Sequence, residues 1–271
     1  MRFSRSVAAR FTLAIPLLLC ACPRSEGDLS KVKLPDHGTG TANISDTPES
    51  IFQRIEENVR TARTIRVEFD RGSPNRSDPG WCGADRTGAW GMLLIGERGR
   101  LLLSDRSSAS TSVVEHLLVS NGSTLRQGMF VIKQGARTAT SQGTREQRIS
   151  MTRIENSRML LARVGVGCLS ILADSTTTEM DVRQRFQVSD FKNGPVDDNG
   201  QSITYALTVS HPQGRSMSEV TLWYDPSSFK PLKRRESRRL AEGRMITEEV
   251  YSTFTYNDQI ADEEFLPQLP E

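Results

Sequence analysis

The residue types that most often carry catalysis or bind metals are sparse in this chain of 271 residues. It has four cysteines, Cys20, Cys22, Cys82 and Cys168, and three histidines, none of which stands at metal-ligand spacing from another ligand. We find no nucleophile elbow, zinc-protease, P-loop or dinucleotide-binding motif. We therefore predict a protein that is not an enzyme and that needs no metal or other cofactor.

The N-terminus has the layout of an export signal. Residues 1–21 contain three arginines, no acidic residue, and an apolar run that is too short to span a bilayer. Residues 19–22, Leu-Cys-Ala-Cys, resemble a bacterial lipobox, which implies that Cys22 becomes the lipidated first residue. The alternative is an ordinary cleaved signal that leaves a soluble periplasmic protein. We place the chain in the bacterial cell envelope, anchored by lipid and facing the periplasm, and Pro23 weakly favours the outer membrane.

Residues 22–46 are rich in Pro, Gly, Ser, Thr and charge, and they lack hydrophobic periodicity. We interpret them as a flexible tether that holds the domain of residues 47–271 roughly 25 to 30 Å from the lipid. The net charge of +2 belongs to the signal, because its removal leaves 32 basic against 33 acidic side chains. The mature domain is thus nearly neutral.

Cys82 and Cys168 are the two cysteines that remain in the domain. In an oxidising periplasm they can form a disulfide between the polar loop 71–87 and a helical segment. They can equally be independent, with Cys168 buried in a helix. The sequence leaves both possibilities open.

The domain opens with a helix followed at once by a strand. Thr47 can cap the helix, Pro48 suits its first turn, and apolar residues then recur every three or four positions over about sixteen residues. From Ile65 to Asp70 apolar and polar residues alternate, which is typical of a half-buried, edge-like strand.

Short apolar runs separated by turn residues follow. Runs at 89–95, 100–104 and 113–119 predict successive hairpins of an antiparallel sheet, and both faces of 89–95 are apolar and so must be covered. Residues 144–175 have apolar residues at helical spacing, interrupted by Gly165 and Gly167, which predicts two short helices with a bend between them. Further strands are predicted at 186–191, 203–210, 219–224, 231–238 and 245–256. The fold class is therefore α+β, with a long antiparallel meander.

Several phrases resemble the lipoprotein-carrier superfamily, whose members are LolA/LolB-like proteins. They stand at 51–56, 64–69, 119–125, 222–226, 230–234, 251–254, 260–262 and 265–267. The resemblance implies a strongly curved antiparallel sheet that forms an unclosed β-barrel, lidded by short helices. It also implies that the concave face shelters an acyl chain of a lipid or lipoprotein.

Such a site needs a continuous apolar lining, because each Å² of apolar surface removed from water contributes about 25 cal/mol. The candidate lining residues are Trp90, Met92, Leu94, Leu101, Leu103, Leu207, Val209, Leu222 and Trp223. The same residues also fit an ordinary core. We expect binding of a lipid or lipoprotein; the alternative is a regulatory or scaffold lipoprotein on the same fold, with another envelope protein as partner and no bound lipid.

A basic cluster between Lys230 and Arg239 fits either an anionic ligand or the solvated face of a strand. Export makes nucleic acid an unsuitable partner for this cluster. We therefore expect the membrane, reached through the lipidated N-terminus, to be the principal partner, and no nucleic acid.

Overall fold

The computed structural model describes residues 46–72, 89–109, 112–148, 151–167, 169, 182–196, 200–211, 214–240 and 243–265. Five helical segments lie among the described residues: α1 Pro48–Thr61, η2 Glu97–Gly99, α2 Met151–Val164, α3 Val182–Arg185 and η4 Asp262–Phe265. The strands are β1 Ile65–Gly72, β2 Ala89–Ile95, β3 Arg100–Ala109, β4 Ser112–Asn121, β5 Thr124–Lys133, β6 Ala136–Arg148, β7 Phe186–Asn193, β8 Gln201–His211, β9 Gly214–Tyr224, β10 Pro231–Leu240 and β11 Gly243–Tyr256.

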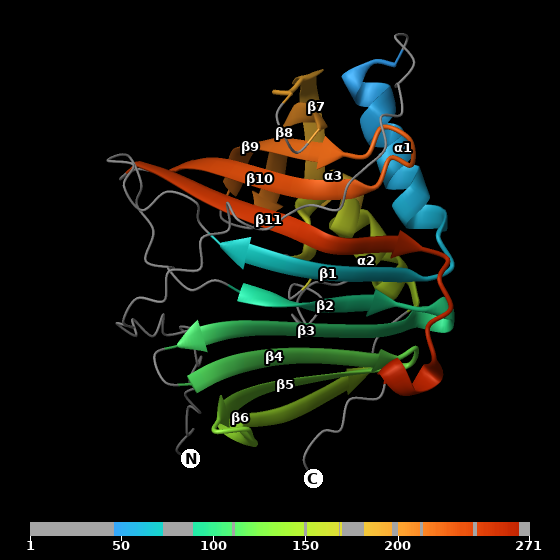
Figure 1. Ribbon diagram of the computed structural model, residues 1–271. Helices are drawn as coiled ribbons and strands as arrows, with labels where there is room; N and C mark the ends of the chain where they lie inside the picture. Colours follow the sequence, from blue (N-terminus) through green and yellow to red (C-terminus); the bar gives the residue numbers. More distant parts are fainter. Residues whose placement is uncertain are drawn as a thin grey trace, which may run out of the picture.

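All eleven strands form one antiparallel sheet in the order β6-β5-β4-β3-β2-β1-β11-β10-β9-β8-β7. The order begins and ends with different strands, so the described sheet is not closed into a barrel, and it curves so that β7 and β8 lie behind β9 (Figure 1). The predicted fold class, a curved antiparallel sheet with a few short helices, is confirmed.

β1 is a central strand, and the prediction of an edge-like strand is wrong. It pairs with β2 on one side and with β11 on the other, where Ile65 lies opposite Tyr256. Its alternation arises because Ile65 and Val67 point to a helix-covered face while Arg66 and Glu68 point to the opposite face, so polar residues in a strand need not mark an edge.

α1 forms for the reasons that its sequence indicates. The Thr47 side chain caps the helix by accepting a hydrogen bond from the Ser50 N–H at 3.2 Å, and Pro48 stands in the first turn. Its buried residues, Ile51, Phe52, Ile55 and Val59, form one stripe. The Phe52 ring packs 4.9 Å from the Tyr205 ring of β8, measured between centroids, which fixes α1 against the C-terminal half of the sheet.

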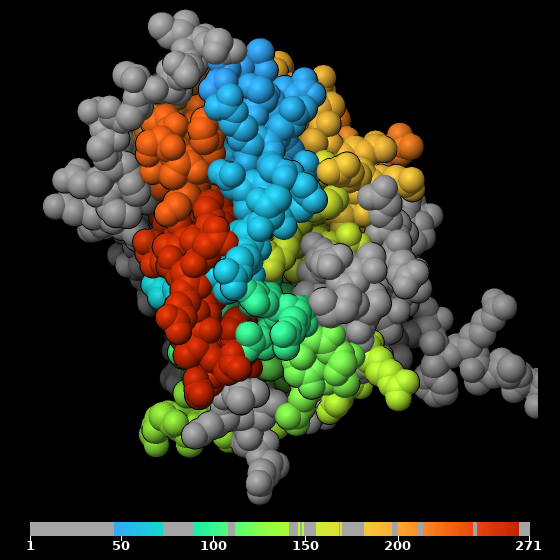
Figure 2. All heavy atoms as spheres, turned by 90° about the vertical axis from the view of Figure 1, so that its right-hand side faces the viewer, coloured from blue at the N-terminus to red at the C-terminus, as the bar shows by residue number. Residues whose placement is uncertain are grey.

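The helices α1, α2 and α3 cover one face of the sheet, which we call the helix-covered face. One continuous cluster of buried apolar side chains lies between them and strands from both halves of the chain. Figure 2 shows α1 in blue on this side of the molecule, with the C-terminal strands on one flank and α2 on the other. This cluster is the main core.

The opposite face, which we call the open face, has a smaller apolar cluster of its own. Leu94, Leu102, Leu117 and Phe130 lie there beneath Ile260 and Phe265 of the C-terminal segment. Figure 1 shows η4 in red at this face beside β3 and β4. The prediction that both faces of residues 89–95 are covered holds at Leu94, which lies beneath the chain's own C-terminal segment, but not at Trp90, which is exposed on the open face.

The region predicted to be helical from 144 to 175 is only partly so. Residues 144–148 belong to β6, and α2 begins at Met151 and ends at Val164, after which Gly165 adopts a φ of +73°. The glycine permits this left-handed turn, so the predicted bend lies at the end of α2. Among the described residues, no helix has both the length and the apolar character needed to cross a membrane.

Candidate functional site

The nine predicted lining residues lie on two faces of the sheet. Leu93 and Leu103 are directly opposite each other in the β2–β3 pairing, and both belong to the helix-covered core. Leu94 and Leu102 are the next pair, and both belong to the open-face cluster. Because side chains alternate along each strand, no single surface can contain Leu94 and Leu103 together. The nine residues therefore cannot form one continuous lining.

Five of the nine face the helices. Leu101, Leu103, Leu207 and Leu222 are at most 3% exposed and belong to the main core, and Val209 is half-buried against it. They come from β3, β8 and β9, on both sides of the central strands. In this structure they contact the protein's own side chains. A ligand on this face therefore has to displace part of the helical cover.

The other four lie on the open face of the sheet, where two of them are nevertheless buried. Trp90 is 36% exposed and, with Met92, lines a hollow of about 550 Å³ on the open face, whereas Leu94 lies buried beneath the C-terminal segment. Trp223 is 1% exposed, and the Lys233 Nζ lies 5.1 Å from its ring centroid, a cation–π contact. These residues line surface hollows or support neighbouring side chains.

The end of α2 is fixed to the sheet by a buried carboxylate. Glu249 of β11 is 2% exposed and accepts hydrogen bonds from the Val166 N–H at 2.9 Å, the Gly167 N–H at 2.7 Å and the Tyr251 hydroxyl at 2.8 Å. A Cβ at Gly165 would overlap the same carboxylate, so glycine is required for this close approach. A carboxylate that accepts two consecutive backbone N–H groups holds the end of the helix at one position.

A second charge, Arg234 of β10, lies in the same interior. It is 3% exposed and donates a hydrogen bond to Glu236 at 3.0 Å. Burial alone would lower the pKa of Arg234, but the nearby Glu236, Tyr205 and Glu249 raise it, so the guanidinium stays charged. The pKa of Tyr251 is raised well above its usual value by burial and by Glu249, so its hydroxyl remains a donor.

The last turn of α2 is joined to α1 and β7 by Arg163. Its guanidinium donates to Glu56 of α1 at 2.6 Å and to the Phe186 carbonyl at 2.6 Å. The Tyr205 hydroxyl in turn donates to the Arg163 carbonyl at 3.1 Å. α1, α2 and β7 are thus connected through one arginine that is 7% exposed.

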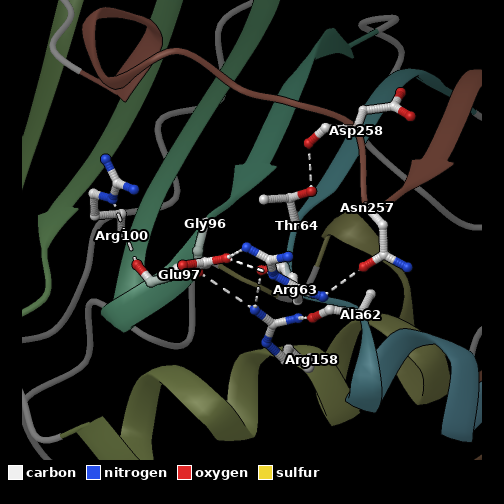
Figure 3. Close-up of polar contacts among 9 residues, drawn as sticks. All are labelled: Ala62, Arg63, Thr64, Gly96, Glu97, Arg100, Arg158, Asn257 and Asp258. Carbon is white, nitrogen blue, oxygen red and sulfur yellow. Dashed lines mark hydrogen bonds and ion pairs between the residues drawn. The ribbon is translucent and has the colours of Figure 1, made fainter.

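Arg158, one helical turn before Arg163, attaches α2 to two loops (Figure 3). It donates to the carbonyls of Ala62, Arg63 and Gly96, with 3.1 Å to Arg63 and 3.3 Å to Gly96. The loop at Arg63 is itself tied to Glu97 by a side-chain hydrogen bond of 2.6 Å, which lowers the pKa of the Glu97 carboxyl. α2 is therefore held at three points along its length by polar contacts.

A larger hollow, of about 840 Å³, lies over β7–β11. Met217 and Leu240 line it with Lys192, Arg239 and Arg244. Thr204, Ala206 and Glu219, which also line it, alternate along β8 and β9 with residues of the main core. Their side chains therefore point to the open face, where most of this hollow lies.

The remaining predicted chemistry is limited by what the structure describes. Within the described ranges, no group of three or more His, Cys, Asp or Glu side chains is arranged to hold a metal ion. The proposed lipidation site Cys22 and the cysteines Cys82 and Cys168 lie outside the described residues. Lipidation and the disulfide remain predictions.

The structure is similar to several solved proteins at low sequence identity. A LolA superfamily protein from Nitrosomonas europaea matches at 12% identity over 82% of this chain and 98% of its own, with a TM-score of 0.27. A DUF1329 family protein from Desulfovibrio piger matches at 14% identity over 82% and 98%, with a TM-score of 0.32. A hypothetical protein from Chlamydia trachomatis matches at 12% identity over 76% and 97%, with a TM-score of 0.30.

One of these solved structures is described as a LolA superfamily protein, and several segments of this sequence were predicted to resemble that superfamily. No protein-family model and no curated protein matches the sequence. Identities and TM-scores this low carry no argument about activity. The inferences below are built on this chain's own residues.

Sequence reasoning missed the polar attachments of α2. Arg158 and Arg163 are spaced five residues apart within an apolar stretch, and Glu249 follows another glutamate in a strand. One signal in the sequence could have indicated these attachments: a charged residue stands at a position where the apolar pattern predicts a core residue. A charged residue is buried only where another group pairs with it. Here that group comes from a segment far away in the sequence, so the sequence alone does not identify it.

Proposed function

We propose that this chain is a lipid-anchored protein of the bacterial cell envelope that binds an acyl chain of a lipid or lipoprotein between α2 and the helix-covered face of its sheet. The observation that supports the proposal is the construction of that cover. α2 places Leu160, Leu161 and Val164 on an apolar face that extends across both halves of the sheet.

The three attachments of α2 are polar, whereas the surface beneath it is apolar. Each attachment is a hydrogen bond to a charged group, which contributes about 1.5–3 kcal/mol. An acyl chain that replaces the α2 side chains recovers about 0.8 kcal/mol for each methylene it buries. Several buried methylenes are therefore needed to offset the release of one such attachment.

Enlarging a buried side chain of α2 tests the proposal. In the full chain, Ala162→Phe adds a ring next to Leu161 in the main core, and Ala206→Phe adds the same ring at the outer hollow. We expect native mass spectrometry and lipid extraction to find bound lipid in the unmodified chain and in Ala206→Phe, and little in Ala162→Phe. Unmodified protein that carries no lipid and binds no fluorescent fatty acid would contradict the proposal.

The anchor has its own test. Growth with an alkyne-labelled fatty acid should label the unmodified chain and leave Cys22→Ser unlabelled. A Cys22→Ser chain that is labelled and remains membrane-bound would show that another residue carries the anchor. Mapping of non-reduced peptides separately tests whether Cys82 and Cys168 are joined.

A scaffold or regulatory protein with a protein partner is the second candidate. It is favoured by the rings of Phe52, Phe191 and Tyr205, which pack 4.9–5.9 Å apart and fill part of the helix-covered face. On this alternative the interior is permanently closed. Lipid-free protein that crosslinks in the envelope to one specific protein would support it over the first.

A further inference from the structure

The ends of two neighbouring hairpins expose apolar side chains. The β8–β9 hairpin ends near Gly214 and the β10–β11 hairpin ends near Leu240, and β9 and β10 are adjacent in the sheet. Met217 is 67% exposed and Leu240 is 36% exposed, and both line the hollow of about 840 Å³. We call Arg215, Met217, Arg239, Leu240 and Arg244 the hairpin-end surface.

Three arginines lie near these two apolar side chains, and the acidic Asp190 and Glu219 also line the hollow. Arg215 stands two residues before Met217 on the same face of β9, and Arg239 lies directly opposite Arg244 in the β10–β11 pairing. All three arginines are exposed. Like charges that face each other across two strands are unfavourable, so the Arg239–Arg244 pair is a place where an added anion stabilises the fold.

The arginines at these ends differ from the basic residues farther along β10. Lys233 and Arg235 both form ion pairs with Glu248, and Arg234 pairs with Glu236. Within the described part of the chain, Arg215 and Arg239 form no ion pair, and Arg244 lies 3.6 Å from Glu219. The basic cluster predicted from sequence therefore contains two kinds of residue. Lys233, Arg234 and Arg235 form ion pairs, whereas Arg239 at the end of β10 forms none among the described residues.

We propose that the hairpin-end surface docks on a bilayer that contains anionic phospholipids. Arginine forks bind phosphate oxygens in a two-pronged geometry, and basic side chains gain attraction near an anionic membrane surface. Met217 and Leu240 are placed to enter the interfacial layer between these contacts. The occupant is a membrane rather than a protein because two isolated apolar side chains among three cations lack the large, charge-depleted centre of a stable protein interface.

This inference is separate from the proposed acyl-chain function. Docking uses side chains at the ends of the β8–β9 and β10–β11 hairpins, whereas the acyl chain would lie under α2. Either can fail without the other.

Vesicle flotation of the full chain tests the docking. All proteins carry Cys22→Ser, so that the proposed anchor does not contribute, and vesicles contain phosphatidylglycerol with phosphatidylethanolamine or phosphatidylcholine alone. We expect binding to the anionic vesicles that weakens as salt rises. The double variant Arg215→Gln/Arg239→Gln should bind about 25-fold more weakly, at roughly fivefold for each arginine.

The matched control is Arg60→Gln/Arg126→Gln, which makes the same change in net charge on α1 and β5 at two side chains that are each 49% exposed. It should bind as the unmodified chain does. Met217→Ser/Leu240→Ser should also weaken binding, and the circular dichroism and melting temperature of every variant should match the parent because the changed side chains are exposed.

A second measurement locates the contact. Amide hydrogen exchange at residues 214–217, 238–240 and 243–245 should slow on anionic vesicles and stay unchanged on phosphatidylcholine. Equal flotation of the arginine variant and its control would overturn the proposal. A dimer in vesicle-free solution that Met217→Ser/Leu240→Ser dissociates would also overturn it, because the surface would then join two copies of the chain.

Discussion

The two faces of this sheet are built from the same strands and yet are closed in different ways. The helix-covered face has one apolar cluster that runs beneath three helices, and its buried charges Glu249 and Arg234 are held by several partners each. The open face has a small cluster beneath one short C-terminal segment, and hollows where Trp90 and Met217 are exposed. Alternation along a strand thus supplies two surfaces, and the covering segments decide which one becomes the core.

The largest effect should come from the buried charge on the helix-covered face. Glu249→Gln replaces one carboxylate oxygen with an N–H₂ group, so that one of the two backbone N–H groups, of Val166 or of Gly167, loses its acceptor. It also removes one of the two carboxylates, Glu236 and Glu249, whose charges act on the buried Arg234. We expect unfolding in urea to show a loss of about 3–5 kcal/mol. A loss below about 1 kcal/mol would mean that α2 does not depend on this attachment.

Two adjacent residues of β2 compare the faces directly. Leu93 is fully buried on the helix-covered face, and Met92 is half-buried on the open face. Leu93→Ala should reduce the free energy of unfolding by about 2–5 kcal/mol because it leaves a cavity in the main core. Met92→Ala should lose less than about 1.5 kcal/mol, since water can fill the space. Equal losses would show that both faces are cores of the same kind.

The fold class follows from sequence because it depends on local signals. Alternating apolar residues and Gly or Asn-Gly turns predict most strands, and Thr47 with Pro48 predicts where α1 begins. The position of β1 does not follow, because its partner β11 lies at the other end of the chain. The register between β2 and β3 does not follow from sequence either. It depends on the geometry of the turn at Gly96, and only the register shows that Leu94 and Leu103 lie on opposite faces.

An ion pair at the open face should matter much less. Arg66 and Glu264 join the C-terminal segment to β1 at 2.6 Å, with side chains that are 23% and 35% exposed. The hydrogen bond from Arg66 lowers the pKa of Glu264, but solvent screens so accessible a pair. Glu264→Gln should therefore change the free energy of unfolding by less than about 1 kcal/mol. A loss as large as that of Glu249→Gln would remove the distinction between the two faces.

The smallest effect should be a pH dependence at His116 of β4. Burial lowers its pKa below the usual value of 6.5, with the charge of Asp105 acting in the opposite direction. The unfolded chain therefore binds this proton more readily, and stability should fall as pH drops through 6.5 toward the lower folded pKa. His116→Asn should flatten that part of a plot of unfolding free energy against pH. An unchanged slope would assign it to other groups.

The central pairing of β1 with β11 has a consequence for synthesis of the chain. β1 to β6 and β7 to β11 are each meanders of neighbouring strands, but Ile65 reaches its partner Tyr256 only when nearly the whole chain is available. Until then β1 has an unpaired edge in the middle of the future sheet, and closing so long a loop is slow. A chain that emerges N-terminus first must therefore keep that edge from aggregating, and a truncation before β11 removes the join between the two halves.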